Sequence, residues 1–188
     1  MPTTDSDDFF PLGVACSGGH YDVVRILIAN GADVNMSGRL SDRLTYNRRH
    51  GCLGEAIAIG NLAIAQELIK HGANIGSMLL VACTAVTPAQ IDLIRLLLDS
   101  GADINRLGKN PYDHRQMATC LSVAIFFDCK LALICELIDR GANADGIPTP
   151  AQWIWNCGNE PSPLRNACVV GRLDLVHVLE IEIEKFYW

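Results

Sequence analysis

The residues best suited to proton transfer form one short run, Tyr112-Asp113-His114-Arg115. A histidine titrates near neutral pH, and a neighbouring carboxylate and phenol can orient it and share its proton. His50, which follows two arginines, is a second candidate for acid–base chemistry. Adjacent loop residues seldom point the same way, however, and residues 110–113 also have the composition of an ordinary proline-containing turn. The candidate catalytic residues are Tyr112, Asp113, His114 and His50.

No cofactor or metal motif accompanies these residues. The sequence has neither a Cys-x-x-Cys pair nor the histidine spacing of a zinc site. It also lacks a glycine-rich phosphate loop and a Gly-x-Ser-x-Gly elbow. We therefore expect no cofactor and no metal, and any reaction would be an isomerisation, a cyclisation or a dehydration.

Residue types that dominate binding energies gather in the same parts of the chain. Residues 36–50 carry a net charge of +3 and residues 106–119 carry +2, whereas the whole chain carries −6. A positive site on a negative body suits an acidic protein segment or an anionic ligand. The alternative is that these stretches are surface loops whose sequences have drifted without a binding role. The pair Trp153 and Trp155 would then pack on its own repeat. The candidate binding residues, all Arg, Tyr or Trp, are Arg39, Arg43, Tyr46, Arg48, Arg49, Arg115, Trp153 and Trp155.

A repeated pattern must position these stretches. Four segments end in nearly the same glycine-led phrase, at residues 31–35, 72–75, 101–105 and 141–145. Each follows a stretch whose apolar residues recur at three- and four-residue spacing, which predicts a helix with one buried face. The glycine is typical of a helix end in a left-handed conformation. The predicted helices cover residues 23–28, 65–69, 93–98 and 133–138.

A second, shorter helix is predicted upstream of each of these. These helices share an alanine at one fixed place, where a small residue lets neighbouring helices approach closely: Ala15, Ala56, Ala82, Ala124 and Ala167. The unit is thus helix, tight turn, helix, glycine turn and extended segment. One such unit cannot bury its own apolar face, so the units must stack.

These motifs resemble the ankyrin repeat. The first repeat has Pro11-Leu12-Gly13-Val14-Ala15-Cys16, then Gly19-His20-Tyr21-Asp22-Val23-Val24, then Gly31-Ala32-Asp33-Val34-Asn35. The resemblance implies an all-α ankyrin-repeat solenoid of stacked helix-turn-helix units, one domain over residues 1–188. Repeats are expected near 10–35, 52–75, 78–105, 120–145 and 163–180, with insertions at 36–50, 106–119 and 146–162 as finger loops. No repeat start keeps the histidine of the family's Thr-Pro-Leu-His motif, so we expect a less regular stack.

Two functions stay open at this point. The resemblance implies a binding protein whose concave face and finger loops engage an acidic protein segment or an anionic small molecule. The alternative is a cofactor-free isomerase or lyase, with the loops closed over a small-molecule pocket. We expect a monomer, with a dimer through the aromatic residues 186–188 as the alternative.

The composition also sets expectations about partners and compartment. The acidic N-terminus lacks the regions of a signal peptide, and no apolar run is long enough for a membrane helix. Eight cysteines in this setting indicate reduced, buried side chains. We expect no membrane and no nucleic-acid partner, and a cytoplasmic location, with the nucleus also compatible.

Overall fold

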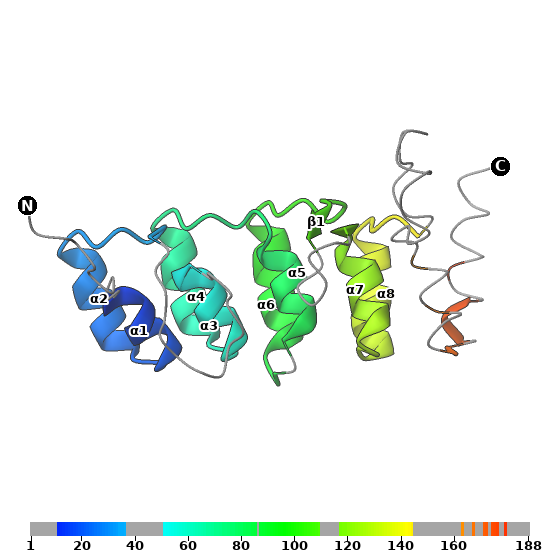
Figure 1. The fold of residues 1–188 in the computed structure, drawn as a ribbon, viewed down its shortest axis with the longest axis horizontal. Coiled ribbons are helices and arrows are strands. Elements are labelled where there is room, and N and C mark those ends of the chain that lie inside the picture. The colour runs from blue at the N-terminus through cyan, green and yellow to red at the C-terminus, as the bar shows by residue number, and fades with distance from the viewer. Residues whose placement is uncertain are drawn as a thin grey trace, which may run out of the picture. The chain divides into compact units, whose positions relative to one another are not determined.

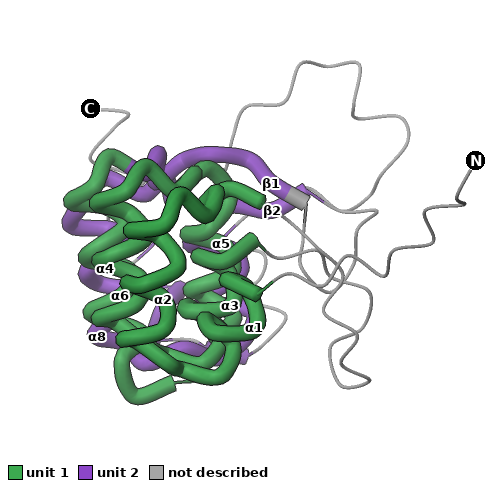
Figure 2. Tube along the Cα trace, turned by 90° about the vertical axis from the view of Figure 1, so that its left-hand side faces the viewer, with its two compact units in different colours: residues 1–101 green, residues 102–188 purple. Residues whose placement is uncertain are grey.

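The computed structural model describes residues 11–36, 51–85, 87–109 and 117–144, with the single positions 163, 167, 171, 172, 174–176 and 179. The chain divides into two compact units, Met1–Gly101 and Ala102–Trp188, which Figure 2 distinguishes by colour. The prediction of one domain stays a prediction.

The described residues of unit 1 form three helix pairs, which follow one another along the chain (Figure 1). They are α1 (Pro11–Ser17) with α2 (Tyr21–Ala29), α3 (Cys52–Ala58) with α4 (Leu62–Lys70), and α5 (Met78–Thr84) with α6 (Gln90–Asp99). The first helices α1, α3 and α5 pack in one row and the second helices α2, α4 and α6 in another (Figure 2). The loops that leave each second helix follow one edge of this stack (Figure 1).

Unit 2 contains one further described helix pair, α7 (Cys120–Phe126) with α8 (Leu131–Asp139). Before it come two short strands, β1 (Gly108–Lys109) and β2 (Met117–Ala118). They pair antiparallel, with Gly108 opposite Ala118 and Lys109 opposite Met117. The helical resemblance did not predict this hairpin. It forms where the two ends of an insertion meet, because extended backbone satisfies its hydrogen-bonding groups by pairing.

The buried positions confirm the predicted helix faces. The five repeated alanines are all buried, with exposed fractions of 4% or less. Leucine and isoleucine side chains of the second helices fill the space between repeats, and the largest fully buried ones include Ile64, Leu68, Leu93 and Leu97. The glycines of the four repeated phrases have positive φ, as predicted: Gly31, Gly72, Gly101 and Gly141.

The starts of the first helices differ from repeat to repeat. Thr119 and Ser122 form a capping box on α7: the Ser122 backbone N–H donates to Thr119 Oγ1 (3.2 Å), and the Thr119 N–H donates to Ser122 Oγ (3.0 Å). Gly51 precedes α3 and Ser77 precedes α5, and neither caps its helix with a side chain. Of these three helix starts, that of α7 alone is stabilised by a side-chain cap.

The cysteines of the described helices pack inside the units. Cys16, Cys52, Cys83 and Cys120 are buried with free thiols, as is Cys129 in the turn between α7 and α8, and Cys135 is half-buried. Hydrogen bonding to Cys52 and burial raise the pKa of the Cys16 thiol. A thiol held protonated is a poor nucleophile and a poor metal ligand. Cys16 therefore behaves as a small apolar side chain, whereas its hydrogen bond to Cys52 lowers the pKa of the Cys52 thiol.

Candidate binding edge at the roots of two insertions

The first two insertions begin with the same backbone turn. In unit 1 the Asn35 N–H donates to Asp33 Oδ1 (2.9 Å). In unit 2 the Asn105 N–H donates to Asp103 Oδ1 at the same distance (2.9 Å). An aspartate that accepts a hydrogen bond from the backbone two residues on fixes a tight turn. Each insertion therefore leaves the stack in a defined direction.

The Asn35 side chain ties the first turn to the next repeat. Its Nδ2 donates to the Gly72 carbonyl (3.0 Å), and its Oδ1 accepts from the Asn74 N–H (2.7 Å). One amide thus satisfies a donor and an acceptor of the neighbouring loop. This amide clamp holds the backbone from which residues 37–50 depart.

Asn105 forms the same amide clamp in unit 2. Its Nδ2 donates to the Gly141 carbonyl (2.9 Å), and its Oδ1 accepts from the Asn143 N–H (2.8 Å). The short connection after α4 differs, because Gly76 stands where the other two loops have asparagine. The amide clamp is thus found at the start of the long insertions 36–50 and 106–119. It is missing from the short connection after α4, among the loops whose flanking segments are both described.

The two ends of the first insertion meet at α3. A Cβ atom added to Gly51, the residue before α3, would lie 3.8 Å from the Met36 carbonyl oxygen. That is an ordinary van der Waals distance. Residues 37–50 therefore start and finish at one place on unit 1. We call residues 33–36 with Gly51 the first root.

The second insertion closes through the hairpin. Pairing of β1 with β2 brings Lys109 opposite Met117, so residues 110–116 connect two adjacent strands. Below the hairpin, Cys120 Sγ donates to the Ile104 carbonyl (3.0 Å) and joins the start of the insertion to α7. We call residues 103–109 with 117–119 the second root.

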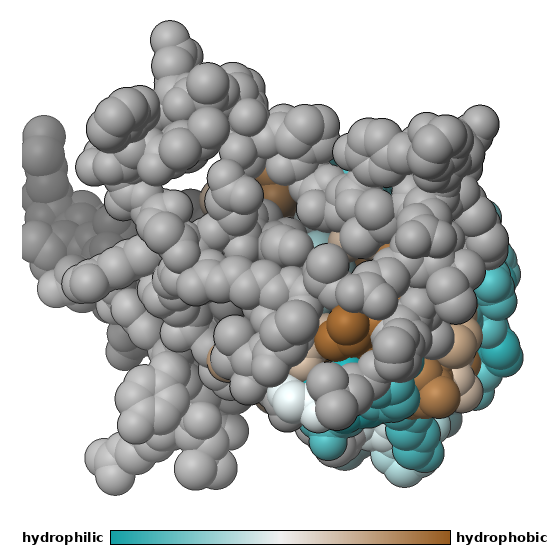
Figure 3. Space-filling model, turned by 90° about the vertical axis from the view of Figure 1, so that its right-hand side faces the viewer, coloured by the Kyte–Doolittle hydropathy of each residue, from teal (hydrophilic) through white to brown (hydrophobic). Residues whose placement is uncertain are grey.

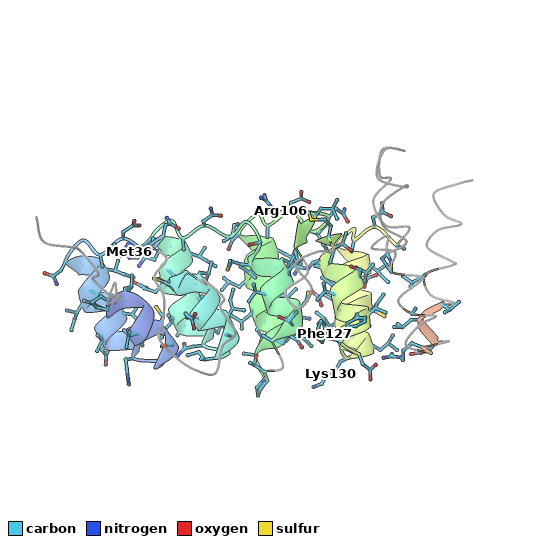
Figure 4. The ribbon with its side chains drawn as sticks, viewed as in Figure 1. Met36, Arg106, Phe127 and Lys130 are labelled. Atoms are coloured by element: carbon cyan, nitrogen blue, oxygen red, sulfur yellow. The ribbon has the colours of Figure 1, made fainter. Side chains whose placement is uncertain are left out.

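Exposed residues at the two roots include apolar and basic ones, and one aspartate in each root, Asp33 and Asp103, is exposed as well. Met36 is 53% exposed and Met117 is 40% exposed. Their neighbours Val34 and Ala118 are buried, at 8% and 4%. Arg106 occupies in the second root the turn position that Met36 occupies in the first, and its side chain is exposed. In unit 2, Arg106 lies at the hairpin edge, whereas Phe127 and Lys130 lie at the opposite edge (Figure 4).

The opposite edge of unit 2 carries an ion cluster. Arg172 donates to the carboxylate of Asp174 (2.7 Å from Nη2) and also to that of Asp128. The Arg172 hydrogen bond lowers the pKa of Asp174. Apolar surface is exposed there too, because Phe126 is 51% and Leu131 43% exposed. Brown apolar atoms interrupt the teal hydrophilic surface in the space-filling view (Figure 3).

The predicted site residues lie outside the described residues. This holds for the acid–base candidates Tyr112, Asp113, His114 and His50, and for the binding candidates Arg39, Arg43, Tyr46, Arg48, Arg49, Arg115, Trp153 and Trp155. Their grouping stays a prediction. Sequence reasoning missed the clamps Asn35 and Asn105, although the contrast with Gly76 was visible in the repeated phrase.

The described part of the chain shows neither a metal site nor a membrane-spanning helix. Within the described ranges, no three His, Cys, Asp or Glu side chains gather in a way that could hold a metal ion. In the same ranges, no helix has the length and apolar character needed to cross a membrane.

Comparison with known proteins supports the repeat assignment. Residues 7–39 match the family model of the ankyrin repeat. No curated protein matches the chain. The matched segment contains α1, α2 and the first amide clamp, and the later helix pairs of the described residues repeat the same elements. The resemblance is thereby confirmed: residues 7–39 carry an ankyrin repeat, and the described fold has the all-α architecture of the ankyrin-repeat family.

Proposed function

We propose that this ankyrin-repeat chain is a protein-interaction module that binds an acidic protein segment with the insertions 36–50 and 106–119. Ankyrin repeats mediate protein–protein interactions in general, and residues 7–39 carry such a repeat. The single observation that carries the finer proposal is the construction of the two roots. Both basic insertions depart from a turn that an asparagine amide clamps to the next repeat.

The charge arrangement supports an acidic partner. Basic residues of the unit 1 helices have acidic neighbours on the same helix: Lys70 lies 4.0 Å from Glu67, and Arg95 lies 3.8 Å from Asp92. Residues 36–50, by contrast, contain four arginines and one aspartate. Residues 36–50 therefore carry an excess of positive over negative charge. Such a patch on an acidic chain attracts acidic segments and repels basic ones.

The closed roots support binding, because they reduce the conformational entropy that an insertion loses when a partner orders it. A loop whose two ends are fixed has fewer conformations than a chain segment with a free end. Less conformational entropy is then lost when a partner orders the loop. Clamping the start of each insertion thus favours affinity without adding a contact to the partner.

The proposal is tested with a fluorescent acidic peptide and a neutral peptide of equal length, titrated with the chain. The quadruple variant Arg39→Gln, Arg43→Gln, Arg48→Gln, Arg49→Gln should bind the acidic peptide roughly tenfold or more weakly, because several exposed charge pairs are lost together. The matched control neutralises four basic residues of the helices: Arg25→Gln, Lys70→Gln, Arg95→Gln, Lys130→Gln. It should bind almost as wild type does.

Two outcomes would sink this proposal. Equal losses in both quadruple variants would show a general charge effect without a site. Selective binding of a small molecule that is lost in His114→Ala, with no peptide bound at all, would favour the cofactor-free enzyme.

A further inference from the structure

We propose that an acidic segment bound at either insertion also carries an apolar residue, which the exposed Met36 takes up at the first root, in unit 1, and the exposed Met117 at the second root, in unit 2. This inference rests on the proposed function and specifies its partner. The partner class is then an acidic, amphipathic peptide segment. A purely hydrophilic polyanion would pair with the basic residues of the insertions and leave Met36 and Met117 uncovered.

Met36 is presented by a fixed backbone. Its N–H donates to the Asp33 carbonyl (3.2 Å), one residue after the Asn35 clamp. Its carbonyl lies against Gly51, which closes the root. The side chain is nevertheless 53% exposed. An apolar side chain held outward on ordered backbone loses little entropy when a partner covers it.

Met117 is presented in the same way by the hairpin. Successive residues of a strand point to opposite faces, so burial of Ala118 at 4% directs Met117 outward, where it is 40% exposed. Arg106 lies at the same root, and its N–H donates to the Asp103 carbonyl (3.2 Å) in the turn that Met36 uses in unit 1. The second root thus offers an apolar side chain and a cation, together with the exposed Asp103 of its turn.

Methionine is suited to this role by its side chain. It is unbranched, flexible and polarisable, so it adapts to apolar partners of different shapes. Other large apolar side chains of the described residues are as exposed, including Ile26 at 61% and Phe126 at 51%. What distinguishes Met36 and Met117 is their place beside the two insertions with a positive net charge.

The test uses two peptides of equal length and equal negative charge, one with leucines between the acidic residues and one with serines. Wild type should bind the leucine peptide roughly tenfold more tightly, as burial of one or two apolar side chains provides. Met36→Ser and Met117→Ser should each reduce this preference several-fold and leave the affinity for the serine peptide unchanged. Met36→Leu and Met117→Leu should retain the preference.

Matched controls remove equally exposed apolar side chains away from the roots, one in each unit: Ile26→Ser and Phe126→Ser. Both should keep the wild-type preference. A second readout is the oxidation rate of Met36 and Met117 by hydrogen peroxide, in which the thioether sulfur gains one oxygen atom and water leaves. Mass spectrometry should show slower oxidation of both residues when the leucine peptide is bound.

The outcomes separate this inference from the proposed function. Tight but equal binding of the two acidic peptides would overturn the methionine anchors and leave the proposed function standing. The same follows if Ile26→Ser or Phe126→Ser reduces the preference as much as Met36→Ser does. If neither acidic peptide binds better than the neutral peptide, the proposed function fails and the inference fails with it.

Discussion

The first repeat and the interior repeats of unit 1 have the same pattern but different surroundings. Val23 stands eight residues before the turn glycine of its repeat, as Ile64 and Leu93 do in theirs. Val23 is 47% exposed, whereas Ile64 and Leu93 are fully buried. A second helix buries this position only when another repeat packs on that side. The comparison teaches that stability is concentrated between repeats, and that the first root depends on the repeat behind it.

The largest expected effect removes an interior side chain. Leu93→Ala should lower the free energy of unfolding by about 2–5 kcal/mol, because it leaves a cavity between α4 and α6. Val23→Ala at the equivalent position should change it by less than about 0.5–1 kcal/mol, since the side chain is already half in solvent. Urea unfolding monitored by circular dichroism measures both. Equal costs would contradict the comparison.

Two turn glycines allow a second comparison between a position with a close neighbour and an open position of unit 1. Gly60, between α3 and α4, has a φ of +76°, and a Cβ there would lie 2.8 Å from Thr87 Cβ. Gly31, after α2, has a φ of +86° with nothing within 4 Å. Gly31→Ala should cost about 1–2 kcal/mol through its backbone conformation alone. Gly60→Ala should cost clearly more by the same unfolding measurement, because Thr87 must move as well.

The amide clamp gives a smaller effect on the same boundary. Asn35→Ala removes two hydrogen bonds between the first and second repeats, to Gly72 and from Asn74. Both are exposed to solvent, so the expected loss is about 1 kcal/mol. Asn35→Ala should also weaken binding of the acidic peptide, because the first root is no longer held. An unchanged stability and an unchanged affinity together would show that the clamp has no role.

The smallest effect lies outside the interior, in the ion cluster of unit 2. Arg172 lowers the folded-state pKa of Asp174, whose ordinary value is about 4. A depressed carboxyl pKa stabilises the fold above that ordinary value, and the stabilisation is lost as pH falls through the folded pKa. Arg172→Gln should return the Asp174 pKa towards its ordinary value, as NMR titration would show. An unshifted titration in the variant would contradict the assignment.

The sequence predicts the parts of this fold that periodic patterns determine. Helical spacing and the turn glycines identify α2, α4, α6 and α8, because these patterns are local. Exposure of Val23 could not be predicted, since it depends on whether a neighbouring repeat is present. The partners of Asn35 and Asn105 lie more than thirty residues away, which a repeated phrase does not reveal. The hairpin pairs residues eight and ten apart, in a stretch without periodic pattern.

The candidate site is less predictable than the fold. Residue types indicated an acid–base cluster and a set of basic and aromatic binders, but loops carry no periodicity that would position them. The roots limit where two insertions begin and end. Met36 and Met117 had no sequence signal, because an exposed and a buried methionine look alike in a sequence.

The most direct test of the account selects peptides without assuming their composition. A random peptide library is displayed and selected against the chain, and in parallel against a variant with residues 37–50 replaced by a Gly–Ser linker of equal length. We predict that the chain enriches acidic peptides with interspersed apolar residues and that the variant loses most of this enrichment. Neutral or basic enriched peptides, or equal enrichment by the variant, would contradict the claim that the insertions bind an acidic segment.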